Sequence, residues 1–122
     1  MAQHNIQGEH GEHMAARYLE EQGYQILEMH WRLGHLEADI IALKDNMLVL
    51  VEVKTRKSDE YGEPESFIDK KKRQACVKLA NAYVQAKQRT EEVRIDVVSI
   101  VLSSNGCQIN HIPNAINSYN LR

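Results

Sequence analysis

Asp39, Glu52 and Lys54 have the types and the spacing of a site that binds a metal ion and moves a proton. They fall in residues 36–43 and 47–54, two runs rich in aliphatic and β-branched side chains that are typical of strands. The short polar break between the runs indicates a hairpin turn. With an even-length turn, Asp39 lies opposite Glu52, and the period of two along each strand puts Lys54 on the same face.

Two opposed carboxylates repel each other unless a positive charge lies between them. Oxygen ligands such as Asp39, Glu52 and the backbone carbonyl of Val53 suit Mg²⁺ or Mn²⁺. Lys54 would hold a water molecule beside such an ion. The plainer interpretation is that these are solvated charges on an exposed sheet face, neutralised by Lys54 and Arg56. The choice depends on the register, because a slip of one residue would separate the pair.

A helix is predicted over residues 8–22, where apolar residues recur with helical spacing and Gly23 supplies the stop. Glu12 lies on the core-facing side of this helix, so it could bring a third carboxylate to the sheet. The alternative is that Glu12 only complements the helix dipole. Residues 24–33 follow as a strand in which apolar odd positions alternate with polar even ones.

The segment after the hairpin is predicted to meet a ligand. Residues 57–65 form a polar loop with Gly and Pro, and Ser66 is expected to cap a helix over residues 67–87, with Asp69 as a partial capping box. Lys72 falls inside the apolar stripe of this helix. It either extends to solvent or points at an anion across the sheet.

Two more strands are predicted, over residues 93–102 and 107–112. Arg94 and Asp96 share one face of the first, where pairing with each other explains both. The element order α-β-β-β-α-β-β predicts an α/β fold with a single mixed β-sheet flanked by helices, and the long helix crosses over to a parallel neighbour. No linker or repeat divides residues 1–122, so one domain is expected.

The charge distribution leaves the partner open. A net charge of −2 gives no global case for nucleic acid. Basic residues nevertheless gather between positions 54 and 78, where they form either a phosphate track or a solvated face. The candidates for nucleic-acid contact are Arg56, Lys57, Lys72 and Arg73.

Other classes of protein find less support. No apolar run is long enough for a membrane span and the N-terminus does not resemble a signal peptide, so a cytoplasmic protein is expected. Cys76 and Cys107 lack the C-x-x-C spacing of a zinc site. A metalloprotein unrelated to DNA would use His4, His10 and His13, but these do not have H-E-x-x-H spacing.

Several short motifs follow one another along nearly the whole chain. They are Gly8-x-x-Gly11-Glu12-x-x-Ala15, Leu19-x-x-x-Gly23-Tyr24, Glu37-Ala38-Asp39-Ile40-Ile41-Ala42, Val51-Glu52-Val53-Lys54-x-Arg56, Lys72 with Leu79, Ala80 and Tyr83, and Arg94-Ile95-Asp96-Val97-Val98. This series resembles the PD-(D/E)xK nuclease superfamily. It is most similar to the YraN-like group, small bacterial proteins related to Holliday-junction resolvases.

The resemblance implies a restriction-endonuclease-like core and a role for each matching residue. Asp39 and Glu52 look like the metal-binding carboxylates, and Lys54 looks like the lysine that assists the attacking water. Glu12 looks like the helix-borne acid that completes the site, and Lys72 and Arg56 look like phosphate-facing accessories.

The implied function is a metal-dependent DNA endonuclease that hydrolyses phosphodiester bonds, on branched or otherwise structured DNA. The alternative is a nucleic-acid-binding module that cleaves nothing. A resolvase-like enzyme would also be expected to form a homodimer, because two symmetric strand cuts need two sites.

Overall fold

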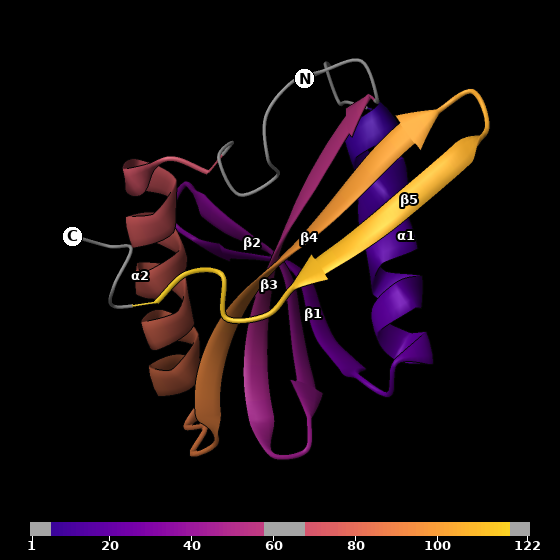
Figure 1. Cartoon of the computed structure of the whole chain (residues 1–122). Coiled ribbons are helices and arrows are strands. Elements are labelled where there is room, and N and C mark those ends of the chain that lie inside the picture. Colours follow the sequence, from indigo (N-terminus) through magenta and orange to yellow (C-terminus); the bar gives the residue numbers. More distant parts are fainter. Residues whose placement is uncertain (1–5, 58–67, 118–122) are drawn as a thin grey trace.

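The computed structural model describes residues 6–57 and 68–117. The elements, in chain order, are α1 (Ile6–Glu21), β1 (Gln25–Leu33), β2 (Leu36–Lys44), β3 (Met47–Lys57), α2 (Lys70–Lys87), β4 (Glu92–Ser103) and β5 (Gly106–Ile112). The strands form one sheet in the order β1-β2-β3-β4-β5, with α1 and α2 on opposite sides (Figure 1). The predicted α/β fold with one mixed sheet flanked by helices is confirmed.

The connections follow from the direction of the strands. β3 and β4 are parallel and the other neighbouring pairs are antiparallel. A parallel pair needs a long crossover, and α2 supplies it as predicted. The β2–β3 turn is tight, because Asp45 and Asn46 both have positive φ, at 51° and 63°, which suits the twist of a two-residue hairpin loop. Lys44 therefore pairs with Met47, as the sequence predicted.

Each face of the sheet carries its own apolar core. In the described part of the chain, eight fully buried apolar residues lie on the α1 side, where the alternating residues of β2 and β3 meet the helix: Ala15, Leu19, Ile40, Ala42, Val49, Val51, Val98 and Ile100. The α2 side buries Ala38, Ile41, Leu48, Leu50, Ile68, Cys76, Leu79, Ala80, Tyr83, Ile95, Val97 and Ile116. A strand buried on both faces reads as a nearly continuous apolar run, and β3 does so from Leu48 to Val51.

The sheet divides at Asp39. β2 pairs with β3 from Lys44 to Ile40, and the next part of β2, down to Leu36, pairs with β1. β3 instead continues along β4 as far as Lys57. In Figure 1 the end of β1 and the start of β2 turn toward α2, whereas β3, β4 and β5 continue away from α2. Asp39 thus lies at the root of a fork between two arms of the sheet.

The alternation predicted for residues 24–33 is wrong in detail. A bulge falls between Ile26 and Glu28, and His30 has a φ of 57°. Met29 packs on the α1 side, but Trp31, two residues later, packs on the α2 side. A left-handed residue rotates the chain, so the period of two does not survive it.

The start of α2 also differs from the prediction. The helix begins at Lys70, and its N-cap is Asp69, whose carboxylate accepts a hydrogen bond of 2.8 Å from the backbone N–H of Lys72. Asp69 therefore has the capping role that was predicted for Ser66. Ser66 and most of the predicted polar loop lie outside the described residues. Within the described chain, no helix is both long and apolar enough to cross a membrane.

Candidate active site

Asp39 joins the two arms of the fork through its side chain. Its Oδ2 accepts a hydrogen bond of 2.9 Å from the backbone N–H of Val53. Burial raises the pKa of Asp39, against the opposing effects of this hydrogen bond and of the charge on Lys72. The predicted neighbourhood of Asp39 and Glu52 is present, but the backbone ladder ends one residue earlier, at Ile40 and Val51.

Glu52 is 4 % exposed, and its carboxylate faces α2. Its Oε2 lies 3.1 Å from the Nζ of Lys72, and its Oε1 lies 3.8 Å from the thiol of Cys76. Burial and the charge of Asp39 raise the pKa of Glu52 to about 7, although Lys72 opposes them. Lys72 therefore points at an anion across the sheet, one of the two orientations that the sequence left open.

Glu12 reaches the same place from the other face. Gly11 packs so closely on β3 that a Cβ there would overlap the hydroxyl of Thr55, which brings the first turns of α1 against the strand. Burial raises the pKa of Glu12 to about 7, and the nearby charge of Asp39 adds to the rise. The third carboxylate predicted from the helical stripe thus lies beside Asp39.

His30 is a residue of this site that sequence reasoning missed. Its Nε2 lies 2.9 Å from the Oε1 of Glu12, and its Nδ1 lies 3.6 Å from Glu37. The Nε of Arg32 lies 3.2 Å from the same oxygen of Glu37. In a regular strand His30 would share one face with Glu28 and Arg32. No sequence signal marks the left-handed residue apart from the tolerance of His for that conformation.

Lys54 and its neighbours line the end of β3. The positive charge of Lys54 opposes the rise of the pKa of Glu52. Ser99 pairs with Lys54 in the parallel ladder, and its buried hydroxyl has no hydrogen-bond partner among the described residues. Arg56 and Lys57 follow Lys54 along the strand, and the guanidinium of Arg56 donates to the carbonyl of Lys57 at 3.3 Å. Arg73 comes directly after Lys72 in the first turn of α2.

A cavity of about 350 Å³ opens beside Asp39, between the β1–β2 hairpin and the N-terminal turns of α2. Its lining carries both signs of charge, with Glu37, Asp39 and Asp69 among the acids and Lys71 and Lys72 among the bases. Both signs are needed where a cation and a phosphate are to meet.

The acids at this site carry oxygen donors, and each acid is engaged by a protein group. Among the described residues, no three His, Cys, Asp or Glu side chains are grouped in a way that could already hold a metal ion. Glu52 binds Lys72, Glu12 binds His30, and Asp39 binds the N–H of Val53. Carboxylate oxygens nevertheless suit Mg²⁺ or Mn²⁺, and buried acids with raised pKa values gain most from a nearby cation.

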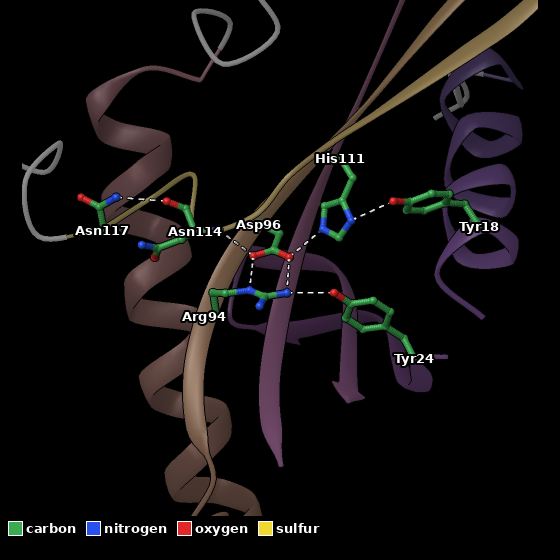
Figure 2. A network of polar contacts seen from close by, with 7 residues as sticks. All are labelled: Tyr18, Tyr24, Arg94, Asp96, His111, Asn114 and Asn117. Carbon is green, nitrogen blue, oxygen red and sulfur yellow. Dashed lines mark hydrogen bonds and ion pairs between the residues drawn. The ribbon is translucent and has the colours of Figure 1, made fainter. Parts of the chain in front are cut away.

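A second polar cluster lies on the α1 side of β4 and explains Asp96. This residue is completely buried, and its carboxylate accepts two hydrogen bonds from Arg94, at 2.8 and 2.9 Å. His111 Nε2 lies 2.7 Å from Asp96 Oδ2, and the backbone N–H of Asn114 donates a hydrogen bond of 2.9 Å to Asp96 Oδ1 (Figure 2). The pairing of Arg94 with Asp96 predicted from the sequence is confirmed. Burial would raise the pKa of Asp96, but these hydrogen bonds outweigh it and hold the pKa below its ordinary value.

The outer partners of the cluster come from the start of the chain. Tyr24 accepts a hydrogen bond of 2.8 Å from Arg94, and the hydroxyl of Tyr18 lies 3.0 Å from His111 Nδ1 (Figure 2). The cluster thereby ties α1 and the segment before β1 to β4, β5 and the turn after β5. Among the described residues, no buried side-chain nitrogen or oxygen of this cluster lacks a partner, which is typical of a structural network.

Residues 11–100 match the model of the "Uncharacterised protein family UPF0102". The chain belongs to the UPF0102 family. UPF0102 is the YraN family within the restriction-endonuclease-like superfamily, so the resemblance found in the sequence is confirmed. The matched residues include Glu12, Asp39, Glu52 and Lys72.

UPF0102 proteins of several bacteria match nearly the whole chain. A UPF0102 protein of Bacteroides thetaiotaomicron is 43 % identical over 115 residues, which are 94 % of this chain and 95 % of that protein. Another, of Flavobacterium johnsoniae, is 42 % identical over 119 residues, 94 % of this chain and 97 % of its own length. A third, of Porphyromonas gingivalis, is 42 % identical over 117 residues, which cover 94 % and 87 % of the two chains.

Proposed function

We propose that the chain is a metal-dependent endonuclease that hydrolyses phosphodiester bonds in DNA, with branched or structured DNA as the preferred substrate. The observation that carries the proposal is the meeting of Asp39, Glu52 and Glu12 at the fork of the sheet, next to Lys72 and Lys54. All three neighbouring carboxylates have raised pKa values, and perturbed pKa values cluster at functional sites.

The acids would hold Mg²⁺ or Mn²⁺, with Asp39 and Glu52 as the main ligands and the Val53 carbonyl and Glu12 completing the set. A bound divalent cation lowers the pKa of its water and stabilises the extra charge of the transition state. Lys54, two residues after Glu52 on the same strand, orients the attacking water.

The basic residues would bind the DNA backbone. Lys72 now neutralises Glu52 at 3.1 Å, and it becomes available to a phosphate once Glu52 has another positive partner. Arg56, Lys57 and Arg73 would contact phosphates to either side, where each contact adds affinity without reading sequence.

The test is cleavage of labelled four-way-junction, flap, single-stranded and duplex DNA with Mg²⁺ or Mn²⁺. We expect the wild type to cut at least one substrate, and Asp39→Asn and Lys54→Ala to lose that activity at least a hundredfold. Asp45→Asn is the matched control for Asp39→Asn, because it makes the same chemical change in an exposed turn. It should cut like the wild type.

A non-cleaving nucleic-acid-binding module is the second candidate. It is favoured by the ion pair of Lys72 with Glu52 and by the engagement of each acid with a protein partner. Its signature would be junction or flap DNA that is retained in a gel but left intact with either metal. A homodimer is part of the endonuclease proposal, and sedimentation of the protein with and without four-way-junction DNA tests it.

A further inference from the structure

We propose that His30 is a positioning residue that fixes Glu12 against Asp39, and that its left-handed backbone serves this purpose. The inference rests on the proposed function, because it assigns His30 to the same metal site. It is carried by two features that coincide in one residue: an unusual backbone conformation and a contact with a site carboxylate.

The backbone of His30 turns the β1–β2 pair at the level of the site. Met29 pairs with Ile40 and Trp31 pairs with Ala38, so His30 lies opposite Asp39 and the register of the two strands does not change there. Yet the packing switches sides at this level, because Met29 and Ile40 lie on the α1 side and Trp31 and Ala38 on the α2 side. The φ of 57° therefore accompanies the turn of the strand pair that places Asp39 at the root of the fork.

The imidazole then spans the gap between a helix and a strand. Its Nε2 meets Glu12 of α1 at 2.9 Å, and its Nδ1 faces Glu37 of β2 at 3.6 Å. Arg32 holds Glu37 from the far side at 3.2 Å. A glutamate has three side-chain torsions and needs such a partner to keep its carboxylate in one place.

An ordinary surface ion pair would not need this arrangement. Exposed pairs form from flexible side chains on relaxed backbones and contribute little to stability. His30 instead adopts a conformation that costs a non-glycine residue energy, and such residues gather at functional sites. The side chain of His30 is 43 % exposed and that of Glu12 is 18 % exposed. His30 therefore lies on the solvent side of Glu12, and the more buried acids lie on its other side.

Two substitutions remove the imidazole of His30 while the left-handed backbone stays accessible, and a third substitution is the control. His30→Gly keeps the left-handed conformation accessible and removes the imidazole. His30→Asn keeps both a residue that tolerates the conformation and a side-chain amide donor. His13→Ala is the control, because it removes an exposed imidazole next to Glu12 in the sequence.

The first readout is the affinity for Mn²⁺, measured by titration calorimetry on the whole chain. Removal of a group that orients a metal ligand costs about tenfold or more in affinity. We expect this loss for His30→Gly, a smaller one for His30→Asn, and none for His13→Ala. In a double-mutant cycle, adding His30→Gly to Glu12→Gln should cause no further loss, because His30 acts through Glu12.

The second readout needs no metal. In protein labelled with ¹³C at glutamate carboxyls, Glu12→Gln identifies the Glu12 resonance, and His30→Gly should shift it while His13→Ala leaves it in place. A wild type that binds no Mn²⁺ would remove the metal from the proposed function, yet a shifted Glu12 resonance would still support the positioning role. An unshifted resonance in His30→Gly overturns the role of His30, whether or not Mn²⁺ binds.

Discussion

The side chain of Asp39 makes with the N–H of Val53, at 2.9 Å, the kind of contact that backbone carbonyls make along the preceding part of β2 and β3. The carboxylate thereby closes the fork at its root, and the backbone of β2 is free to leave β3 there. Asp39 is consequently both a site residue and a structural one, and its substitutions should reveal the two roles separately.

Asp39→Asn should leave the free energy of unfolding unchanged or increase it. The amide oxygen can still accept a hydrogen bond from the N–H of Val53, and the substitution removes a carboxylate charge that burial disfavours. Asp39→Ala should lower the free energy of unfolding by about 1–2 kcal/mol, because the N–H of Val53 loses its partner. Urea denaturation of the two variants measures the difference. Equal losses in both would show that the charge, not the hydrogen bond, holds the fork.

The free energy of unfolding of the metal-free protein should decrease as the pH rises from 5 to 8. Folding raises the pKa of Glu12 and Glu52 to about 7, above the unfolded value of about 4.3. Their contribution is therefore complete below about pH 4 and is lost as the pH rises through 7, with a slope of at most about 1.4 kcal/mol per pH unit for each group. Thermal unfolding at several pH values measures it, and Glu52→Gln should flatten the profile.

The same linkage predicts the effect of metal. Mn²⁺ should raise the unfolding temperature more at pH 8 than at pH 5.5, because protons and the cation compete for the same carboxylates. A stabilisation independent of pH would place the ion away from Glu12 and Glu52.

Asp96→Asn should destabilise the protein by about 3–5 kcal/mol, since it leaves the guanidinium of Arg94 without its buried counter-charge. The loss should be measurable by urea denaturation at pH 7 and should not depend on metal. Asp45→Asn, in the exposed turn, should change stability by less than about 0.5 kcal/mol. A similarly small effect of Asp96→Asn would mean that the network of Figure 2 contributes little.

Gly11→Ala should lower stability by about 1–2 kcal/mol despite the better helix propensity of alanine, because the new methyl group meets Thr55. It should also weaken Mn²⁺ binding, since Glu12 follows Gly11. Thr55→Ala removes the obstructing hydroxyl, and the double variant should be close to Thr55→Ala alone in both measurements. Additive losses would instead point to a backbone cause.

The strongly periodic parts of the fold were predictable from the sequence. The register of the β2–β3 hairpin follows from its short turn and from alternating apolar residues, and the pairing of Lys44 with Met47 confirms it. The position of Glu12 beside the sheet likewise follows from helical spacing. In both cases a local pattern determines which face a residue occupies.

What the sequence did not reveal depends on departures from regular geometry. The fork ends the β2–β3 ladder before Asp39, and the left-handed His30 changes the faces of its neighbours, because twist is decided by packing across the whole sheet. The start of α2 was misplaced because Ser66 and Asp69 are both good N-caps, and only the position of the first turn distinguishes them. The partners of Asp96 lie far apart in the chain, so only the Arg94 contact could be foreseen.

The parallel ladder of β3 and β4 joins residues that are 45 positions apart, whereas short turns link β1, β2 and β3. During synthesis the first three strands can therefore assemble early, while the strongly apolar β3 waits with an open edge for β4 to arrive. Unpaired apolar edges attract other chains. The protein is thus most exposed to aggregation just before β4 pairs with β3.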